Sequence, residues 1–187
     1  MATVNFPRLA LVALAATTVA ACGSSPVASS QPQLKGCPTA APDSGVAPEW
    51  TLTGATGAVA VTGSTDSTAP LVEVTAPFSV TETRVQTLQG GDGPVVGDTA
   101  TVSVCYMGVN GRDGNVFDSS YLRGDPVEFP LDGVIAGFQK AIAGQNVGST
   151  VAVAMTPADG YPSGQPAAGI RPGDSLVFAI KILDVTS

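Results

Sequence analysis

The sequence contains no histidine and few basic residues. Its 187 residues include 8 lysines and arginines against 15 aspartates and glutamates, which gives a formal net charge of −7. The absence of histidine excludes Ser-His-Asp hydrolysis, histidine general-base catalysis and most zinc sites. The acidic balance leaves no basic surface for nucleic acid and argues against simple electrostatic attraction to anionic lipid. An enzyme of this composition would act mainly through the shape and apolar character of its site, and we expect it to use neither a metal nor a cofactor.

The apolar run near the N-terminus is too short to span a membrane. Residues 9–21, after Arg8, would extend only about 20 Å as a helix, against about 30 Å for a bilayer core. The run ends in Val-Ala-Ala-Cys at residues 19–22, followed by Gly-Ser-Ser, and so resembles a bacterial lipobox. We interpret residues 1–21 as a lipoprotein signal peptide, with cleavage before Cys22 and lipidation of its thiol. This predicts a protein anchored by lipid to the extracytoplasmic face of a bacterial cell membrane. The alternative is an ordinary secretory signal with an incidental cysteine.

Two segments separate this signal from the rest of the chain. Residues 22–48 are rich in Ser, Ala, Pro and Gln without periodicity, which predicts a flexible tether. Residues 49–78 contain two stretches with strand composition, at 58–62 and 71–74, and we interpret them as an appended β segment. The lone tryptophan, Trp50, lies here, and we expect it to pack this segment onto the following domain rather than to bind a ligand.

Two cysteines remain besides Cys22. After export, Cys37 and Cys105 would lie in an oxidising compartment, where disulfide formation is favoured. A disulfide between them would pin the tether and the appended strands against an outward-facing position of the sheet. The alternative is that Cys37 is free and that Cys105 is a small buried residue.

The chain from residue 78 onward has the pattern of an α+β domain. Strand-like segments occur at about residues 79–89, 99–107, 115–118, 150–156 and 175–185. A short extended piece at 127–131 leads to one helix at about 134–144, which Asp132 could cap. We predict an antiparallel, curled, five-stranded sheet (a half-barrel) wrapped around one short helix, with no helix before residue 134. One face of the sheet should cover the helix, and the other should be more solvated.

Several short motifs in this region occur in the order and spacing of one known family. They are Tyr106-Met107-Gly108, Asp113-Gly114, Phe117-Asp118-Ser119-Ser120, Val134-Ile135-Ala136-Gly137-Phe138, Val147-Gly148, Pro157 with Tyr161, Ile170 with Pro172, and Leu176-Val177-Phe178. Together they resemble the FK506-binding-protein (FKBP) type of peptidyl-prolyl cis-trans isomerase over residues 80–187. The resemblance implies an FKBP-like fold for residues 79–187, prolyl isomerase activity, proline-containing polypeptide clients and binding of FK506-like macrolides.

The resemblance also implies a role for each matched residue. The catalytic residues would be Tyr106, Phe117, Asp118 and Tyr161, and the substrate-binding residues would be Arg123, Val127, Val134, Ile135, Phe138, Ile170 and Phe178. Asp118 would point its carboxylate into the pocket, held by Arg123 and by the Tyr106 hydroxyl. Phe138 would form the pocket floor, where most members of the family have tryptophan. By residue type alone, the same aromatic residues would be core side chains, and Asp118 and Arg123 a turn cap and a solvated charge.

Two functions are compatible with these residues. The first is a membrane-tethered prolyl isomerase that assists the folding of exported or envelope proteins. The second is a non-catalytic module of the cell envelope that binds proline-containing segments as a chaperone or assembly factor. The first is favoured because the tyrosine, the Phe-Asp pair, the arginine and the loop tyrosine are all present, and an isomerisation assay would separate the two.

Overall fold

A computed structural model describes residues 36–186 of the chain, which belong to one compact unit. The predicted signal peptide (1–21), Cys22 and the first part of the expected tether lie outside the described residues. No helix within residues 36–186 is long and apolar enough to cross a membrane. The described residues form two β-sheets, two short α-helices and two short 3-10 helices, labelled η1 (Leu131–Gly133) and η2 (Pro166–Ala168).

The larger sheet has six strands in the order β4-β8-β9-β5-β6, with β7 also paired to β5. The strands are β4 (Arg84–Gln89), β5 (Thr101–Asn110), β6 (Val116–Ser119), β7 (Val127–Pro130), β8 (Thr150–Met155) and β9 (Leu176–Thr186). All neighbouring strands run antiparallel, and β5 pairs with β9 along its whole length. The sequence predicted five strands. The sixth is β7, because the extended piece expected as a connection pairs with β5, as at Val104↔Val127.

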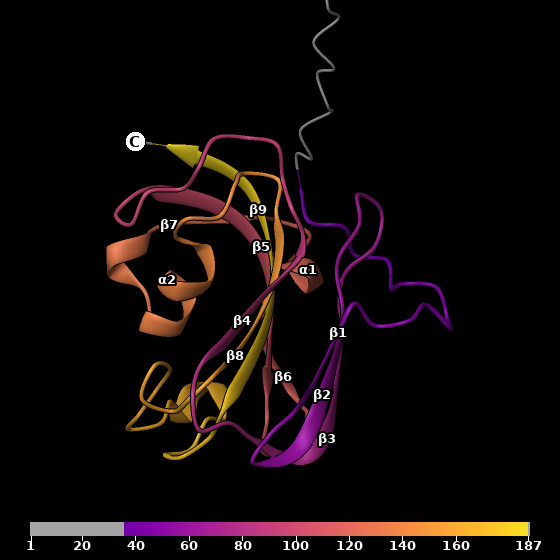
Figure 1. The fold of residues 1–187 in the computed structure, drawn as a ribbon, viewed down its shortest axis with the longest axis vertical. Coiled ribbons are helices and arrows are strands. Elements are labelled where there is room, and N and C mark those ends of the chain that lie inside the picture. The colour runs from indigo at the N-terminus through magenta and orange to yellow at the C-terminus, as the bar shows by residue number, and fades with distance from the viewer. Residues whose placement is uncertain (1–35, 187) are drawn as a thin grey trace, which may run out of the picture. The chain divides into compact units, whose positions relative to one another are not determined.

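The smaller sheet has three strands, β1 (Trp50–Thr53), β2 (Thr56–Thr62) and β3 (Leu71–Ser79), in that order. It packs on the face of the large sheet that was expected to be more solvated (Figure 1). The buried cluster that joins the sheets consists of Val59, Val61, Phe78, Ala152, Ala154, Val177 and Ala179. The expectation of a solvated face was wrong because β8 and β9 carry apolar residues at successive positions, so both of their faces are buried. Trp50 packs against this cluster, as predicted.

The helix α2 (Ala136–Ile142) packs against the opposite face of the large sheet, where the main hydrophobic core lies (Figure 1). A Cβ atom at Gly137 would lie 2.9 Å from the Cβ of Met155, so glycine lets α2 approach β8 closely. The helix is shorter than expected, and Asp132 does not cap it. Asp132 lies in η1 (Leu131–Gly133), and the extended residue Ile135 occupies the N-cap position without a side-chain hydrogen bond.

A second helix, α1 (Ser120–Arg123), directly follows β6, so the prediction of no helix before residue 134 was wrong. Ser119 caps α1, because its hydroxyl accepts a hydrogen bond from the Leu122 N–H at 3.4 Å. Gly124 ends it in the left-handed conformation, with a φ of 78°. A serine before and a glycine after a short segment are helix signals, but a single helical turn is too short to show periodicity.

The N-terminal end of the described chain is attached to the sheet. Cys37 forms a disulfide with Cys105, the first of the two alternatives for these cysteines, and its N–H donates to the Gly124 carbonyl at 2.9 Å. Ala40 pairs with Thr68 in an isolated bridge. This part of the expected flexible tether is therefore fixed in the fold.

Cys105 itself is 1% exposed, although it was expected on an outward face. It belongs to a small buried cluster with Cys37, Ala69 and Tyr121, from three other segments of the chain. The outer face of β5 is thus covered by α1 and by residues that precede β3.

Candidate functional site

A pocket of about 370 Å³ lies where α2 faces the large sheet, and we call it the aromatic pocket. Its lining consists of Tyr106, Phe117, Asp118, Val127, Phe129, Gly133, Val134, Ile135, Phe138, Tyr161 and Phe178. Six of these residues are aromatic, out of ten aromatic residues in the whole sequence. Asp118 is the only charged residue among them, so the wall is predominantly apolar with one carboxylate at a fixed place.

Phe138 is at the centre of the aromatic cluster. Its ring centroid lies 5.0 Å from Phe178, 5.5 Å from Phe129 and 5.6 Å from Tyr106, each in an edge-to-face arrangement. Such pairs are favourable because the positive edge of one ring meets the negative face of another. Since Phe138 is only 5% exposed, its rotamer is fixed from several sides. The pocket floor is therefore packed against neighbouring rings on several sides.

Gly108 allows two of the rings to meet. Phe117 and Phe178 pack edge to face, with their centroids 5.5 Å apart. A Cβ atom at Gly108 would lie 2.6 Å from Phe117 and 2.7 Å from Phe178, distances that real Cβ contacts essentially never show. The glycine of the Tyr-Met-Gly motif is thus required by the packing of the pocket wall.

Tyr106, Asp118 and Arg123 form a hydrogen-bonded polar cluster at the edge of the pocket. The Tyr106 hydroxyl donates to one carboxylate oxygen of Asp118, and Arg123 Nη1 donates to the other at 2.6 Å. Arg123 Nη2 also approaches the Tyr106 hydroxyl oxygen at 3.5 Å. Each member comes from a different element, β5, β6 and α1, so the cluster depends on how these three meet.

The cluster keeps Asp118 ionised and Tyr106 neutral. Partial burial alone would raise the pKa of Asp118, but the hydrogen bonds from Tyr106 and Arg123 outweigh burial and hold that pKa below its ordinary value. Burial, followed by the hydrogen bond to Asp118, raises the pKa of Tyr106 to about 12. At neutral pH the phenol is therefore a donor and the carboxylate a fixed negative charge.

Tyr161 reaches the pocket from the connection between β8 and β9, which is anchored at both ends. At its start, Asp159 accepts hydrogen bonds from Thr83 Oγ1 at 2.5 Å and Lys140 Nζ at 2.7 Å. The Asp159 carbonyl accepts from the Gly137 N–H of α2 at 2.8 Å. This end of the connection is therefore hydrogen-bonded to α2, the helix that also carries Phe138 of the pocket floor.

The other end is anchored by Asp174, whose carboxylate is buried. It accepts hydrogen bonds from Asn110 Nδ2 at 2.7 Å, from the Arg171 N–H at 2.9 Å and from Arg112 Nε at 3.2 Å. Arg112 Nη2 also donates to the Gly169 carbonyl at 3.0 Å. The hairpin after β5 thereby holds the segment that leads into β9.

The structure brings together nine of the eleven residues expected at the site: Tyr106, Phe117, Asp118, Val127, Val134, Ile135, Phe138, Tyr161 and Phe178. Arg123 does not line the pocket, but it donates hydrogen bonds to two lining residues, Asp118 and Tyr106. Ile170 does not line the pocket. It is 2% exposed and belongs to the main core with Leu176, and it directly follows the left-handed Gly169.

Two lining residues, Phe129 and Gly133, were not expected. Phe129 shares a face of β7 with Val127, and strand alternation from Val127 would have identified it. It supplies an aromatic ring on a strand where Val127 alone would give an aliphatic wall. Gly133 lies in η1, and no pattern in the sequence marks it.

The hydrogen-bond network of residues 36–186 contains no bond donated by the Ile135 N–H or by the Tyr161 hydroxyl, although both residues line the pocket. Both groups can therefore donate to a ligand. Within the same residues, no cluster of three or more histidine, cysteine, aspartate or glutamate side chains is arranged to hold a metal ion.

Comparisons with known proteins agree on one family. The family model described as FKBP-type peptidyl-prolyl cis-trans isomerase matches residues 93–183. FkpA of Escherichia coli K12, an FKBP-type peptidyl-prolyl cis-trans isomerase, is 39% identical over 101 residues, which are 54% of this chain and 36% of FkpA. A probable FK506-binding protein of Corynebacterium glutamicum is 38% identical over 96 residues, which are 50% of this chain and 78% of that protein.

The fold agrees with these sequence matches. The crystal structure of Escherichia coli FkpA aligns with a TM-score of 0.51 at 36% identity, over 56% of this chain and 48% of that one. This chain thus spans less than half of FkpA but more than two thirds of the Corynebacterium protein. With the aromatic pocket inside the matched region, the chain belongs to the FKBP-type peptidyl-prolyl cis-trans isomerase family.

Proposed function

We propose that this protein catalyses the cis-trans isomerisation of X-Pro peptide bonds in exported or envelope polypeptides. The observation that carries the proposal is the aromatic pocket with the Asp118 carboxylate fixed at its edge. An apolar cavity of about 370 Å³ is within the usual range for a small-ligand site and has room for a prolyl ring. We also propose that the large sheet curls around α2 as a half-barrel and that the pocket lies between the sheet and the helix.

The reaction requires no covalent bond to the protein. Rotation about the X-Pro bond is slow because it breaks amide resonance, with a barrier of about 18–20 kcal/mol. The twisted amide is less polar than the planar one, so an apolar pocket holds it better than water does. Each tenfold gain in rate requires only about 1.4 kcal/mol of such preference.

The lining residues divide this task. The prolyl ring would lie on Phe138, between Tyr106 and Phe178. The Asp118 carboxylate would face the carbonyl of the twisting amide, and its own partners keep it ionised and in place. The Ile135 N–H and the Tyr161 hydroxyl would donate to the substrate backbone. The same pocket would accept FK506-like macrolides, which present a comparable apolar ring.

An assay of isomerisation tests this function. A proline peptide would be followed by NMR exchange with purified protein that lacks residues 1–21 and carries Cys22→Ser. We expect catalysis that an FK506-like macrolide inhibits competitively. Binding of the peptide without any acceleration would refute the enzyme and support a proline-binding chaperone or assembly module instead. Absence of both binding and acceleration would refute both functions.

We also propose that Cys22 anchors the protein to the extracytoplasmic face of a bacterial membrane. The supporting observation is the short apolar run that ends at Val-Ala-Ala-Cys. One acyl chain gives only marginal attachment, so stable anchoring would need two or more chains on Cys22. In growing cells the wild-type protein should sediment with membranes, and Cys22→Ala should be released from them or mislocalised. A soluble, unmodified wild-type protein would contradict the anchor.

A further inference from the structure

The outer edge of β5 lacks a strand partner at Tyr106. On this edge, β7 pairs with residues 101–104 of β5 and β6 pairs with residues 107–109. Cys105 and Tyr106 lie between the two ladders, while the other edge of β5 is occupied throughout by β9. A backbone N–H left unpaired inside a sheet would cost free energy, so the Tyr106 N–H needs an acceptor from outside the strands.

The side chain of Ser120 supplies that acceptor. Its hydroxyl oxygen accepts a hydrogen bond from the Tyr106 N–H at 2.8 Å and lies 3.4 Å from the Tyr106 carbonyl oxygen, to which it can donate. Ser120 is 0% exposed, so water does not compete for these bonds. One hydroxyl thus meets both backbone groups that a neighbouring strand would otherwise bond.

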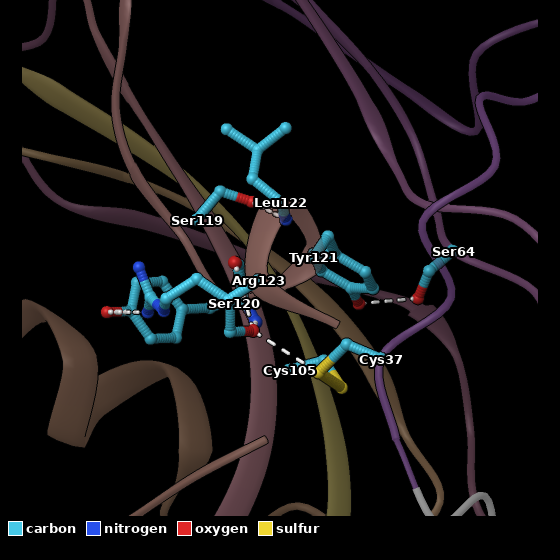
Figure 2. Close-up of a disulfide and its surroundings, with 9 residues drawn as sticks. Cys37, Ser64, Cys105, Ser119, Ser120, Tyr121, Leu122 and Arg123 are labelled. Carbon is cyan, nitrogen blue, oxygen red and sulfur yellow. Dashed lines mark hydrogen bonds between the residues drawn. A yellow bond between two sulfur atoms is a disulfide. The ribbon is translucent and has the colours of Figure 1, made fainter. Parts of the chain in front are cut away.

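Ser120 lies next to the disulfide at the N-terminal end of α1 (Figure 2). The Sγ atom of Cys37 lies 3.3 Å from the Ser120 hydroxyl, and the disulfide joins Cys37 to Cys105, the neighbour of Tyr106. At the other end of α1, the Gly124 carbonyl accepts from the Cys37 N–H at 2.9 Å. Cys37 therefore contacts both ends of α1, and the disulfide links it to β5 next to the unpaired stretch.

The same short helix carries Arg123, and the residue before its cap is Asp118. A shift of Ser120 would consequently move all three members of the polar cluster relative to one another. Tyr106 would lose the bond that fixes its backbone, and the Asp118 and Arg123 side chains would move with β6 and α1. The Tyr106 hydroxyl donates to Asp118 in this geometry, and we expect that bond to be weakened when Ser120 shifts.

We propose that Ser120 is a positioning residue for the isomerase site: its hydroxyl fixes the backbone of Tyr106 where the β5 ladder is interrupted, and so aligns the Tyr106–Asp118–Arg123 cluster. The disulfide acts behind it by holding α1 in place. The catalytic part of this inference rests on the proposed isomerase function, whereas the alignment of the cluster does not.

The test compares two variants of α1 in the purified protein with its disulfide intact. Ser120→Ala removes the hydroxyl that bonds Tyr106. Tyr121→Phe is the matched control, because it removes a buried hydroxyl on the same helix that bonds Ser64 at 2.8 Å and does not contact the cluster. For each variant we would measure kcat/KM on a proline peptide, the melting temperature, and the pKa of Asp118 by carboxyl ¹³C NMR.

Both variants should melt at lower temperature, but only Ser120→Ala should affect the site. We expect its kcat/KM to fall at least about tenfold, since small misplacements in a site cost rates of this order. The pKa of Asp118 should rise toward its ordinary value, because its two donors no longer align. Ser120→Thr, which keeps the hydroxyl, should restore the wild-type pKa of Asp118.

Wild-type kcat/KM and wild-type Asp118 pKa in a folded Ser120→Ala protein would overturn the proposal and leave Ser120 a structural residue. If the wild-type protein proves inactive, the proposed function fails, and the Asp118 titration alone decides the positioning role. If Ser120→Ala does not fold, amide exchange in the wild type decides it. Slow exchange of the Tyr106 N–H, like that of paired β5 amides, supports the hydrogen bond, and fast exchange overturns it.

Discussion

Asp118 is the one charge in the lining of an apolar pocket, and its replacement separates chemistry from stability. Asp118→Asn keeps the size of the side chain but removes the negative charge that, in the proposed mechanism, would face the amide. Because the carboxylate is partly exposed, its hydrogen bonds contribute only modestly to stability, so we expect a small decrease in melting temperature and a fall in kcat/KM of about tenfold or more. Tyr161→Phe should act in the same direction through the lost hydroxyl.

The matched control for this prediction is Asp184→Asn, which changes an exposed carboxylate at the far end of β9. It should leave the rate unchanged. Asp118→Asn and Tyr161→Phe proteins that isomerise the peptide at the wild-type rate would remove both residues from the catalytic assignment, whatever their fold.

Phe138 limits how the pocket floor can be altered. Phe138→Ala would open a cavity among three rings and should destabilise the protein by about 3–5 kcal/mol. Phe138→Trp restores the residue common in the family, but the ring is enclosed by neighbours 5.0–5.6 Å away. We therefore expect overpacking of about 1–3 kcal/mol and no faster turnover, measured by denaturant unfolding and by the peptide assay. A faster and equally stable Phe138→Trp protein would show that the floor limits catalysis.

Single residues of the site were predictable where a regular element or an ordered motif fixes their direction. Tyr106 and Phe178 follow from strand alternation, and Asp118 follows from its place in the motif. Ile170 was misplaced because it lies in an irregular connection, where sequence spacing does not determine which way a side chain points. Phe129 was missed although alternation from Val127 predicts it.

At the level of elements, the strands of the large sheet were predicted more reliably than the elements that pack on them. The five expected strands all occur, with ends shifted by a few residues, because alternation extends over enough residues to be recognised. The single turn α1 and the face of the large sheet on which β1–β3 pack were not predicted, although Trp50 was expected to pack this segment onto the domain. Neither follows from periodicity, since both depend on contacts between segments distant in sequence.

The disulfide should contribute to stability through the element it holds. Cys37 and Cys105 are 68 residues apart, and closing a loop of this length is worth about 4 kcal/mol in the chain-entropy estimate. The double variant Cys37→Ser/Cys105→Ser should therefore unfold at a lower denaturant concentration, with a free energy of unfolding reduced by about 2–4 kcal/mol. Cys22→Ser is the control and should unfold as the wild type does. Equal unfolding midpoints for all three proteins would contradict this contribution.

For the whole molecule, three carboxylates predict how stability depends on pH. Burial alone would raise the pKa of Asp118 and of Asp174, but their hydrogen bonds lower each below the ordinary value of 3.8. The bonds from Lys140 and Thr83 lower the pKa of Asp159. Because the folded-state values lie below the unfolded ones, the stabilisation is complete above about pH 5 and is lost as the pH falls through the folded values.

The melting temperature should thus change little between about pH 5 and pH 8 and fall steeply below about pH 4. Asp174→Asn should lower the melting temperature at neutral pH and make the acid decrease shallower, since one of the three titrating groups is gone. Thermal scans across pH would measure both effects. An unchanged acid slope in Asp174→Asn would mean that this carboxylate does not contribute.

The family match begins at residue 93, but the folded structure extends to residues before it. Val59, Val61 and Phe78 share a buried cluster with β8 and β9, and Cys37 is bonded to β5. The sequence placed these residues in a tether and an appended segment because composition alone shows no long-range contacts. A fragment that starts near residue 80 would expose the apolar face that β1–β3 cover.

The position of β9 in the large sheet has a consequence for the order of folding. It lies between β5 and β8, so the centre of the sheet joins residues as far apart as Thr101 and Thr186. The β1–β2–β3 meander consists of neighbours along the chain and can form early, whereas the sheet centre must await the final strand. In a chain that emerges from a membrane N-terminus first, the edges of β5 and β8 would stay unpaired until β9 arrives. A protein that we propose to assist the folding of others therefore itself passes through an incompletely paired state before its sheet is formed.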